Sequence, residues 1–200
     1  MIDFAVAPIT LIIIVTIALV SVSALWVDRS LVDRLKLVPS LRAQPYRWVS
    51  SAFVHTGFWH LFVNVFTLYF FGPPLEYWMG SVNYLLLYAG SMLACSAVTC
   101  VLYRRDPGYS AVGASGAVVG VVFGFCLFRP FEVLYFFGLL PIPAIAFAVL
   151  FVAGSLWAVR TRRLPGIAHE GHLGGAAGGV ILTAVLEPQV VASFLRQLGL

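Results

Sequence analysis

The sequence predicts an all-α, polytopic integral membrane protein whose chain crosses the bilayer six times. Hydrophobic residues make up 61% of the 200 residues, where soluble domains have about 45–50%. Charged residues make up 10%, against about 25% in soluble proteins, and the mean hydropathy is +0.98. A soluble fold of this length exposes too much surface to carry so few charges. The composition therefore excludes a soluble domain, a disordered chain, a coiled coil and a disulfide-stapled scaffold.

Six apolar runs supply the predicted membrane helices, since one crossing takes roughly 20 mostly apolar residues. The first run, Pro8–Val27, contains no charge, and it lacks the basic flank of a signal peptide. The other five runs are 59–76, 82–103, 109–128, 143–159 and 172–186. Pro73 and Pro74 are expected to kink or loosen the end of the second run. Most connections are short and no repeat stands out, which predicts one domain over residues 1–200.

Positive charges are concentrated in the connections that follow the first, third and fifth runs. Those connections hold ten of the twelve Lys and Arg residues: Arg29, Arg34, Lys36, Arg42, Arg47, Arg104, Arg105, Arg160, Arg162 and Arg163. The opposite side holds only Arg129 and Arg196. By the positive-inside rule, this distribution places the first, third and fifth connections in the cytoplasm.

Several kinds of site do not fit the residues. The net charge of +4 is spread without a basic stripe, which predicts no nucleic-acid partner. The cysteines lie inside apolar runs, as small core residues do, and not as a disulfide or zinc framework. They are Cys95, Cys100 and Cys126. His169 and His172 are three residues apart, whereas the zinc-protease pattern separates its histidines by four. No third ligand is evident, so we expect no metal and no cofactor.

The fourth apolar run places a serine at the start of a short helix. Gly113 belongs just outside a helix better than inside one, so we expect the helix to begin after it. The 14 residues from Ser115 to Phe128 make about 21 Å of helix, well short of a ~30 Å hydrocarbon core. The helix is therefore expected to begin below the membrane surface, with Ser115 beside unpaired backbone N–H groups. The alternative is that Ser115 only caps the helix.

Small residues recur every fourth position in two of the runs. They are Gly116, Gly120 and Gly124 in the fourth run and Gly171, Gly175 and Gly179 in the sixth. Such ladders let two helix backbones approach closely. If these helices pack together, Ser115 and His172 meet, because each lies next to the first glycine of its own ladder. A histidine in an otherwise uncharged span is costly and so favours a function, although the glycines alone are also consistent with generic packing.

His60 and Asn64 form a second polar pair, in the second run. At positions i and i+4 they share one helix face. Donors held in a water-poor site can stabilise an oxyanion, and each contributes about 2.7–4 kcal/mol in enzymes. The alternative is a polar clamp between helices, worth about 0.6 kcal/mol per hydrogen bond. His55, at the edge of the preceding connection, is expected to support the loop or to face water.

The order of these motifs resembles the rhomboid family of intramembrane serine proteases. The resemblance extends over residues 46–179, about two thirds of the chain. It rests on the segment 46–55, on His60 and Asn64, and on the segments 113–116, 141–144 and 172–175. Gly-Ala-Ser-Gly alone is a weak signal. The ordered set of His-x-x-x-Asn, Gly-x-Ser-Gly and a late His-x-x-Gly, each in its own run, is a strong one.

The resemblance implies a role for each of the polar residues. Ser115 would be the nucleophile and His172 the general base of a Ser–His dyad. His60, Asn64 and the backbone N–H of Ser115 would bind the oxyanion. The fold implied is a six-helix rhomboid-like bundle without a cofactor. The partners implied are the lipid bilayer and transmembrane protein substrates, which would be cleaved after a small residue.

The sequence departs from the family pattern at two places. Many members have an aromatic residue four positions after the serine, stacked on the catalytic histidine, where this chain has Val119. The common Trp-Arg order in the first connection is reversed as Arg47-Trp48. The resemblance also implies that the fifth run, with Phe147, Phe151 and Trp157, is a gate for the substrate.

The resemblance and the charge count disagree about orientation. The family places the first, third and fifth connections outside, so we expect a multi-pass protein of the plasma (inner) membrane whose active site opens to the extracytoplasmic side. Two other functions are the alternatives to a protease. A proteolytically inactive rhomboid-like protein that binds client helices would lack the serine or the histidine, and both are present. A small transporter would favour inverted repeats and acidic groups in the spans. The sequence leaves the oligomeric state open.

Overall fold

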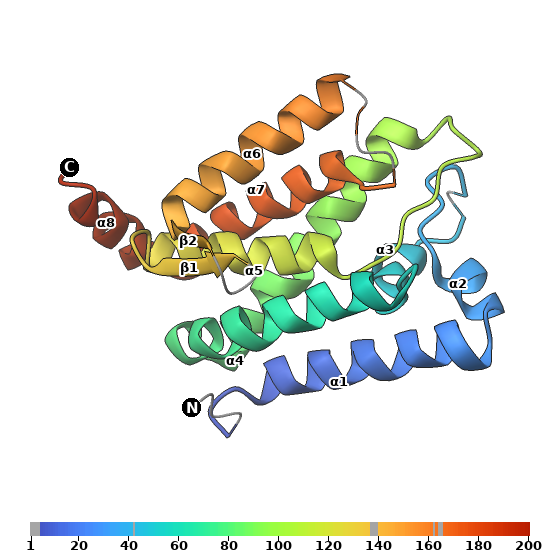
Figure 1. The fold of residues 1–200 in the computed structure, drawn as a ribbon, viewed down its shortest axis with the longest axis horizontal. Coiled ribbons are helices and arrows are strands. Elements are labelled where there is room, and N and C mark those ends of the chain that lie inside the picture. Colours follow the sequence, from blue (N-terminus) through green and yellow to red (C-terminus); the bar gives the residue numbers. More distant parts are fainter. Residues whose placement is uncertain (1–4, 42, 137–139, 162, 164–165) are drawn as a thin grey trace.

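The computed structural model describes residues 5–41, 43–136, 140–161, 163 and 166–200. Over these residues the chain is mostly helical, and the long helices lie side by side as a bundle (Figure 1). The helices are α1 Pro8–Val22, with its π-helical end η1 Ser23–Val27, α2 Ser30–Leu35, α3 Arg47–Ser50, the 3₁₀ turn η2 Ser51–Phe53, α4 Phe58–Tyr103, α5 Ser115–Phe128, α6 Ala144–Thr161, α7 His169–Leu186 and α8 Pro188–Gln197. Of the predicted positive charges, Arg42 and Arg162 lie outside the described residues.

The long α4 is two helices joined at Gly80. Gly80 has φ 73° and ψ 154°, a backbone conformation that favours glycine and interrupts the helix. The two predicted runs 59–76 and 82–103 lie on either side of this break. The chain stays helical through Pro73 and Pro74, so the break falls later than the prolines suggested. A proline removes one backbone donor, but its fixed φ remains helical.

The connection between α5 and α6 departs from the all-α prediction. Strand β1, Val133–Phe136, pairs with strand β2, Leu140–Pro143, as an antiparallel hairpin in which Val133 lies opposite Pro143. The all-α prediction was therefore wrong for this segment, where a strand pair forms. The hairpin pairs backbone N–H and C=O groups that no helix uses.

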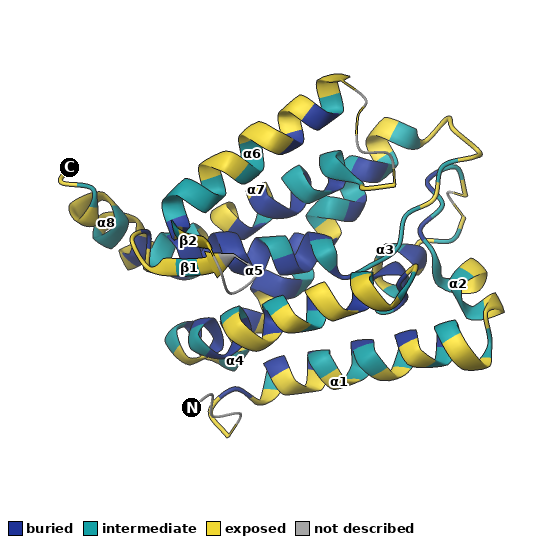
Figure 2. Cartoon of the chain, in the orientation of Figure 1, coloured by how far each residue is buried: buried dark blue, intermediate teal, exposed yellow. Residues whose placement is uncertain are grey.

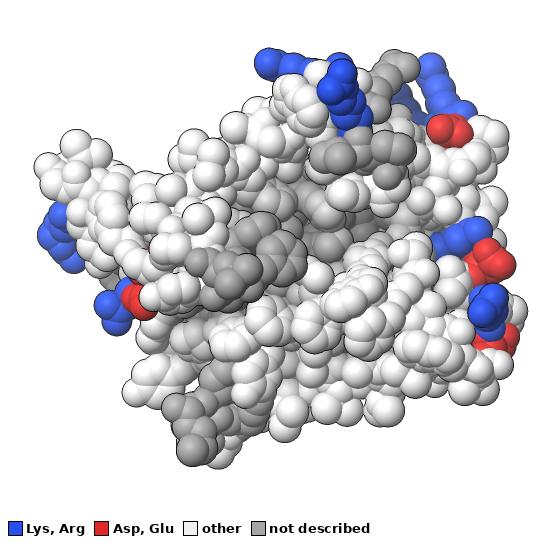
Figure 3. Space-filling view, in the orientation of Figure 1, with Lys and Arg blue, Asp and Glu red and all other residues white. Residues whose placement is uncertain are grey.

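The helices have the length and polarity of membrane-spanning segments. Among the described residues, Pro8–Val27, Phe58–Tyr103 and Ala144–Thr161 are each long and apolar enough to cross a bilayer. A fourth span is added when α7 and α8, bent by 107° at their junction, are taken together. In Figure 3 the charged side chains lie at the left edge and along the top and right edges of the face, and the described residues between them are mostly uncharged. These features describe a multi-pass membrane protein, and the count of six spans stays a prediction.

The core of the bundle is built around α5. Ten of its 14 residues are buried, and it packs between α4 and α7. Figure 2 shows α5 almost wholly buried, whereas α1 and α6 each turn an exposed face outward. Because α5 occupies the centre of the bundle, its first residue, Ser115, lies between neighbouring helices and is half-buried.

A buried carboxylate joins α1 to the break in α4. Glu76 is 1% exposed, and its oxygens accept hydrogen bonds from the backbone N–H groups of Ile9 (3.0 Å) and Thr10 (2.7 Å). The hydroxyls of Thr10 (2.8 Å) and Ser81 (2.6 Å) donate to the same carboxylate. An anion at a helix N-terminus satisfies backbone donors that have no partner within the helix. Glu76 therefore fixes the start of α1 against α4.

Candidate active site

Ser115 is the first residue of α5, as the sequence predicts. The turn before it is held at Gly113, whose φ of 110° favours glycine. The N–H of Gly113 donates to the backbone carbonyl of Ser51 at 2.8 Å. Ala114 at the N-cap position carries no capping side chain, so the free donors of the first helical turn remain next to Ser115.

The glycines of α7 bring its backbone against that of α5. A Cβ added to Gly175 would lie 2.2 Å from the carbonyl oxygen of Gly116, and one added to Gly179 would lie 2.4 Å from that of Gly120. The ladder is not a simple two-helix seam, however, because Gly171 faces Cys95 of α4. At the other end of the ladder, Gly124 lies against Thr183 of α7 and two leucines of α4.

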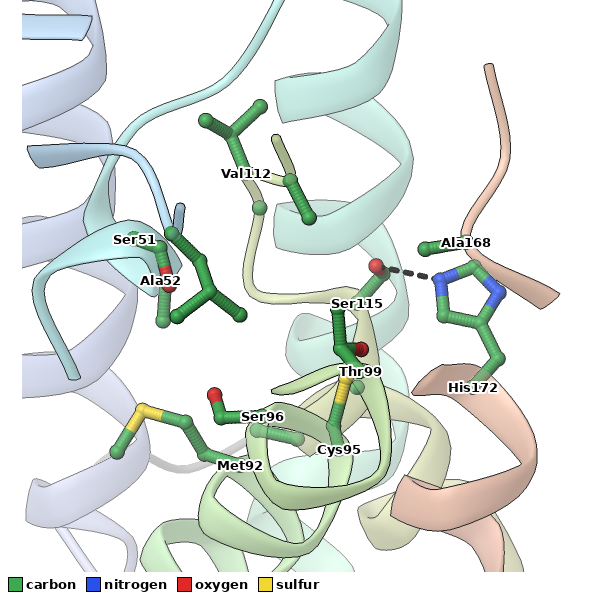
Figure 4. Close-up of a pocket in the computed structure, with 15 residues that line it drawn as sticks. Ser51, Ala52, Met92, Cys95, Ser96, Thr99, Val112, Ser115, Ala168 and His172 are labelled. Carbon is green, nitrogen blue, oxygen red and sulfur yellow. Dashed lines mark hydrogen bonds between the residues drawn. The ribbon is translucent and has the colours of Figure 1, made fainter. Parts of the chain in front are cut away.

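This close approach brings the predicted dyad together. The Oγ of Ser115 lies 2.7 Å from Nε2 of His172, in a hydrogen bond between the first turns of α5 and α7 (Figure 4). Both residues are half-buried. Within hydrogen-bond reach of an imidazole nitrogen, a serine hydroxyl can pass its proton to that nitrogen as it attacks.

The dyad opens onto a large cavity of about 820 Å³. Its walls come from the start of α4, from α5, from α6 and from the loops before α5 and α7. Among its lining residues are Trp59, His60, Asn64, Phe147, Phe151 and Val119. The cavity therefore contains Ser115, His172 and both predicted oxyanion donors, and α6 forms one of its sides.

A second, small cavity of about 30 Å³ lies behind Ser115 (Figure 4). Cys95, Ser96 and Thr99 of α4 line it below the dyad, and Ser51 lines it from the first connection. Its volume corresponds to one or two water molecules. Hydroxyl and thiol groups thus lie directly behind the nucleophile.

His60 and Asn64 lie on the cavity side of the first turns of α4. The His60 ring packs against the turn before Ser115, since a Cβ on Gly113 would lie 2.6 Å from its Nε2. Its Nδ1 lies 3.2 Å from Oγ1 of Thr56. The amide nitrogen of Asn64 donates to the backbone carbonyl of His60 at 2.7 Å, which engages one of its two N–H groups and leaves the other free to act in the cavity.

The first connection is anchored despite its reversed Arg-Trp order. Arg47 is 8% exposed. Its guanidinium donates to the backbone carbonyls of Asp33 (3.0 Å) and Lys36 (2.7 Å) and to the side chain of Gln44. The backbone carbonyl of Trp48 accepts a hydrogen bond from Ser96 of α4 at 2.9 Å. Both residues thus tie this connection to the bundle.

Two residues near the dyad have contacts that the sequence did not reveal. His55 is fully buried and contacts both α1 and Ala114, so it does not face water. Phe151 of α6 places its ring centroid 6.3 Å from that of His172, within the range of aromatic pairs. An aromatic residue on a different helix therefore lies beside the imidazole in a chain that has Val119 on α5.

The motif around His169 does not assemble a metal site over the described part of the chain. No group of three or more His, Cys, Asp or Glu side chains lies close enough there to hold an ion. Glu170 instead accepts a hydrogen bond from the hydroxyl of Tyr103 at 2.7 Å, which ties the end of α4 to the start of α7.

Comparison with known proteins identifies the family. The family model of the rhomboid domain matches residues 42–189, nearly three quarters of the chain. The chain belongs to the rhomboid family. This rhomboid is 34% identical over 138 residues to Rhomboid protein 1, mitochondrial, of Saccharomyces cerevisiae, an alignment that covers 66% of the chain and 39% of the relative.

Other relatives of this rhomboid come from bacteria and animals. The Putative rhomboid protease YdcA of Bacillus subtilis is 40% identical over 83 residues, 42% of this chain and 40% of the relative. Rhomboid-related protein 3 of Homo sapiens is 35% identical over 94 residues, 47% of this chain and 22% of the relative. The alignments span less than half the length of these relatives. As a rhomboid, the chain is a membrane protein of a family of intramembrane proteases.

Proposed function

We propose that this rhomboid is an intramembrane serine endopeptidase that hydrolyses peptide bonds in or near the transmembrane segments of other proteins. The observation that carries the proposal is the 2.7 Å hydrogen bond between Ser115 Oγ and His172 Nε2. This hydrogen bond lies at the start of α5, in the core of the bundle. Both of its residues line a cavity that is also lined by two polar donors, His60 and Asn64.

The proposed reaction begins at Ser115. His172 accepts the hydroxyl proton at Nε2 while Oγ attacks the scissile carbonyl carbon, and it then gives that proton to the leaving amine. Water next attacks the acyl-enzyme with His172 again as general base, which releases the acid product and restores the serine. The cavity beside the dyad is large enough to hold this water together with a substrate segment.

The developing oxyanion would be bound by three donors. They are the backbone N–H of Ser115, the side chain of His60 and the free N–H of the Asn64 amide. The Ser115 N–H belongs to the first turn of α5, where backbone donors lack partners within the helix. Such donors act most strongly where water is excluded, and Asn64 is 3% exposed.

The proposed substrates are transmembrane helices of other proteins that reach the dyad past α6. A helix hides its carbonyl groups in backbone hydrogen bonds, so the segment must unwind before Ser115 can attack. Segments containing Gly, Pro or polar residues unwind at lower cost and are expected to be preferred. Phe147 and Phe151 line the cavity from α6 and form the proposed gate. We further propose that residues 1–200 form one membrane-embedded domain.

The test of this function is cleavage by the purified chain in detergent micelles. A substrate helix with a Gly-containing unwinding site should be cut within its apolar segment, and a fluorophosphonate probe should label the enzyme. Chelators should leave the rate unchanged. If the chain binds the helix but leaves it uncut after prolonged incubation, the client-binding function replaces the protease. Loss of activity with a chelator would point to a metal enzyme instead.

Asn64→Ala is expected to lower kcat by about 10²–10³-fold, the usual loss when an oxyanion donor is removed. Turnover by the purified variant, normalised to folded protein, measures the effect. Thr67→Val is the matched control, because Thr67 also lines the cavity and also bonds a backbone carbonyl of its own helix, that of Val63. An Asn64→Ala protein with a lowered melting temperature but normal turnover per folded molecule would make Asn64 a structural clamp.

We propose that the protein lies in the plasma membrane with its active site on the extracytoplasmic side. Arg104 is exposed at the end of α4, in the loop that leads to Ser115. A cysteine at Arg104, in a chain lacking its three native cysteines, should react with an impermeant maleimide in intact cells. A cysteine at Arg196, in α8 on the opposite side, should react only after lysis. The reverse pattern would show that the positive charges determine the orientation and that the active site faces the cytoplasm.

A further inference from the structure

A second imidazole lies behind the nucleophile and takes no part in the dyad. His55, between η2 and α4, has no exposed surface. Its Nδ1 lies 2.7 Å from the hydroxyl of Ser21, near the end of α1. Its Nε2 lies 3.2 Å from the backbone nitrogen of Ala114, the residue before Ser115. One ring therefore bridges the first helix of the chain and the turn that carries the nucleophile.

The partners of His55 determine where its proton is. The Ala114 N–H can only donate, so Nε2 must be the bare, accepting nitrogen. A neutral imidazole then carries its hydrogen on Nδ1, where Ser21 accepts it. The hydroxyl of Ser21 is free to act as this acceptor because its own hydrogen goes to the backbone carbonyl of Phe53 at 2.9 Å. All three hydrogen bonds are consistent with a single tautomer of the ring.

Burial keeps this ring neutral. It lowers the pKa of His55 to about 3, with a smaller contribution from the neighbouring imidazole of His60. The two rings meet edge to face with their centroids 4.7 Å apart. A protonated ring would present N–H at both nitrogens and would lose the Ala114 donor. The contact with Ala114 is therefore expected to persist across the pH range in which a Ser–His dyad works.

The hydrogen bond to Ala114 fixes the direction of the next peptide. The N–H of Gly113 is engaged by Ser51 and that of Ala114 by His55. With both of these amides held by the protein, the next amide in the turn is the N–H of Ser115, the one to which the proposed function gives the oxyanion. The segment is also closely packed, since a Cβ on Gly113 would lie 2.6 Å from the ring of His60, which itself contacts the His55 ring.

We propose that His55 is a positioning residue for the nucleophile. Its Nε2 orients the Ala114 peptide so that the Oγ and the N–H of Ser115 face the same substrate carbonyl, and Ser21 of α1 selects the tautomer that allows this. Its effect on rate rests on the proposed function, whereas its tautomer does not. A misplacement of about 1 Å in a catalytic group can cost 10²-fold in rate, so the effect is measurable without any contact between His55 and substrate.

Two matched substitutions separate the two contacts of the ring. In His55→Gln the side-chain carbonyl can reach the Nε2 position and accept from Ala114. In His55→Asn the shorter amide can donate to Ser21 but cannot reach Ala114. We expect His55→Asn to lower kcat by about 10–100-fold with KM nearly unchanged, and His55→Gln to keep most of the wild-type kcat. Melting temperatures, measured in parallel, should fall by similar amounts in both.

Two results would overturn the proposal in the rate measurement. One is a His55→Asn protein with wild-type kcat per folded molecule, and the other is an equal loss in both variants that follows their melting temperatures. Ser21→Ala supplies a milder perturbation and should fall between His55→Asn and wild type, because the ring keeps its place but loses the group that selects its tautomer.

The tautomer provides a readout that does not need protease activity. Nitrogen-15 spectra of histidine-labelled protein, assigned with the His55→Gln variant, should show His55 protonated at Nδ1 and bare at Nε2 from pH 5 to pH 9 (about the range in which other histidines titrate). A ring protonated at Nε2, or charged at pH 6, would refute the proposed positioning even in an active protease. The expected tautomer in a chain that cuts no substrate would refute the protease function alone.

Discussion

Ser115→Ala protein is expected to fold like wild type and to leave transmembrane substrates uncut. The substitution removes one oxygen from a half-buried position at the first turn of α5, on the lining of both cavities. Serine proteases that lose the nucleophile lose about 10⁶-fold in kcat. The measurement is appearance of the cleaved product in detergent, together with labelling by a fluorophosphonate, which should mark wild type and fail with the variant.

Ser110→Ala is the matched control for this experiment. Ser110 also lines the large cavity, but it lies in the loop before α5, five residues before the proposed nucleophile. Its variant should cleave substrate and take up the probe like wild type. Normal cleavage by the Ser115→Ala protein would show that Ser115 is not the nucleophile. Labelling of that variant by the probe would show that the probe reacts with a different serine.

Gly175→Ala is expected to be strongly damaging, because the added methyl group would meet backbone at one of the shortest distances found for the described glycines. The new Cβ would lie 2.2 Å from the backbone carbonyl oxygen of Gly116. A backbone carbonyl cannot rotate away from the new methyl group as a flexible side chain can, so α7 must move away from α5. Overpacking of this kind costs about 1–3 kcal/mol in the free energy of unfolding. Because the same movement separates His172 from Ser115, turnover per folded molecule should fall together with the melting temperature.

Gly154→Ala tests the same chemical change where space is open. A Cβ on Gly154 of α6 meets no described atom within 4 Å. Alanine is favoured over glycine inside a helix by about 0.8–1 kcal/mol, so this variant should melt at the wild-type temperature or above. A Gly175→Ala protein as stable and as active as Gly154→Ala would show that α5 and α7 do not depend on their close contact.

The dyad could be predicted from the sequence because its geometry follows from local pattern. A glycine turn followed by a short apolar run places Ser115 at a helix start, and the ladders place His172 on the facing helix. Composition and the length of the apolar runs were enough for a multi-pass helical membrane protein. What these signals share is that each depends on residues near one another in the chain.

Contacts between distant residues could not be predicted in this way. Nothing local to His55 indicates that Ser21 and Ala114 bind its two nitrogens, and nothing near Val119 indicates that Phe151 of another helix lies beside His172. The hairpin between α5 and α6 was missed because Pro141 and Pro143 interrupt any alternating strand pattern. The break in α4 required the backbone conformation of Gly80, whereas the sequence drew attention to the prolines before it.

Two hydrogen-bonded links to α1 extend the packed unit beyond the region that the family model matches. The rhomboid match begins at residue 42, yet Glu76 and His55, both inside that match, take their partners from Thr10 and Ser21. A chain shortened to the matched region would keep every proposed catalytic group, but Glu76 and His55 would lose the partners that α1 supplies and keep only Ser81 and Ala114. Uncompensated burial of such groups costs several kcal/mol.

During biogenesis, therefore, α4 cannot reach its final state in the lipid alone. Three of the four groups described as donating to Glu76 belong to α1, and the fourth, the hydroxyl of Ser81, belongs to α4 itself, so the carboxylate gains most of its donors only when α1 has been inserted and has packed against it. The first helix thus acts as an intramolecular assembly factor for the helices that follow it. Loss of α1 is therefore expected to impair membrane insertion and trigger quality control before any change in catalytic turnover can be measured.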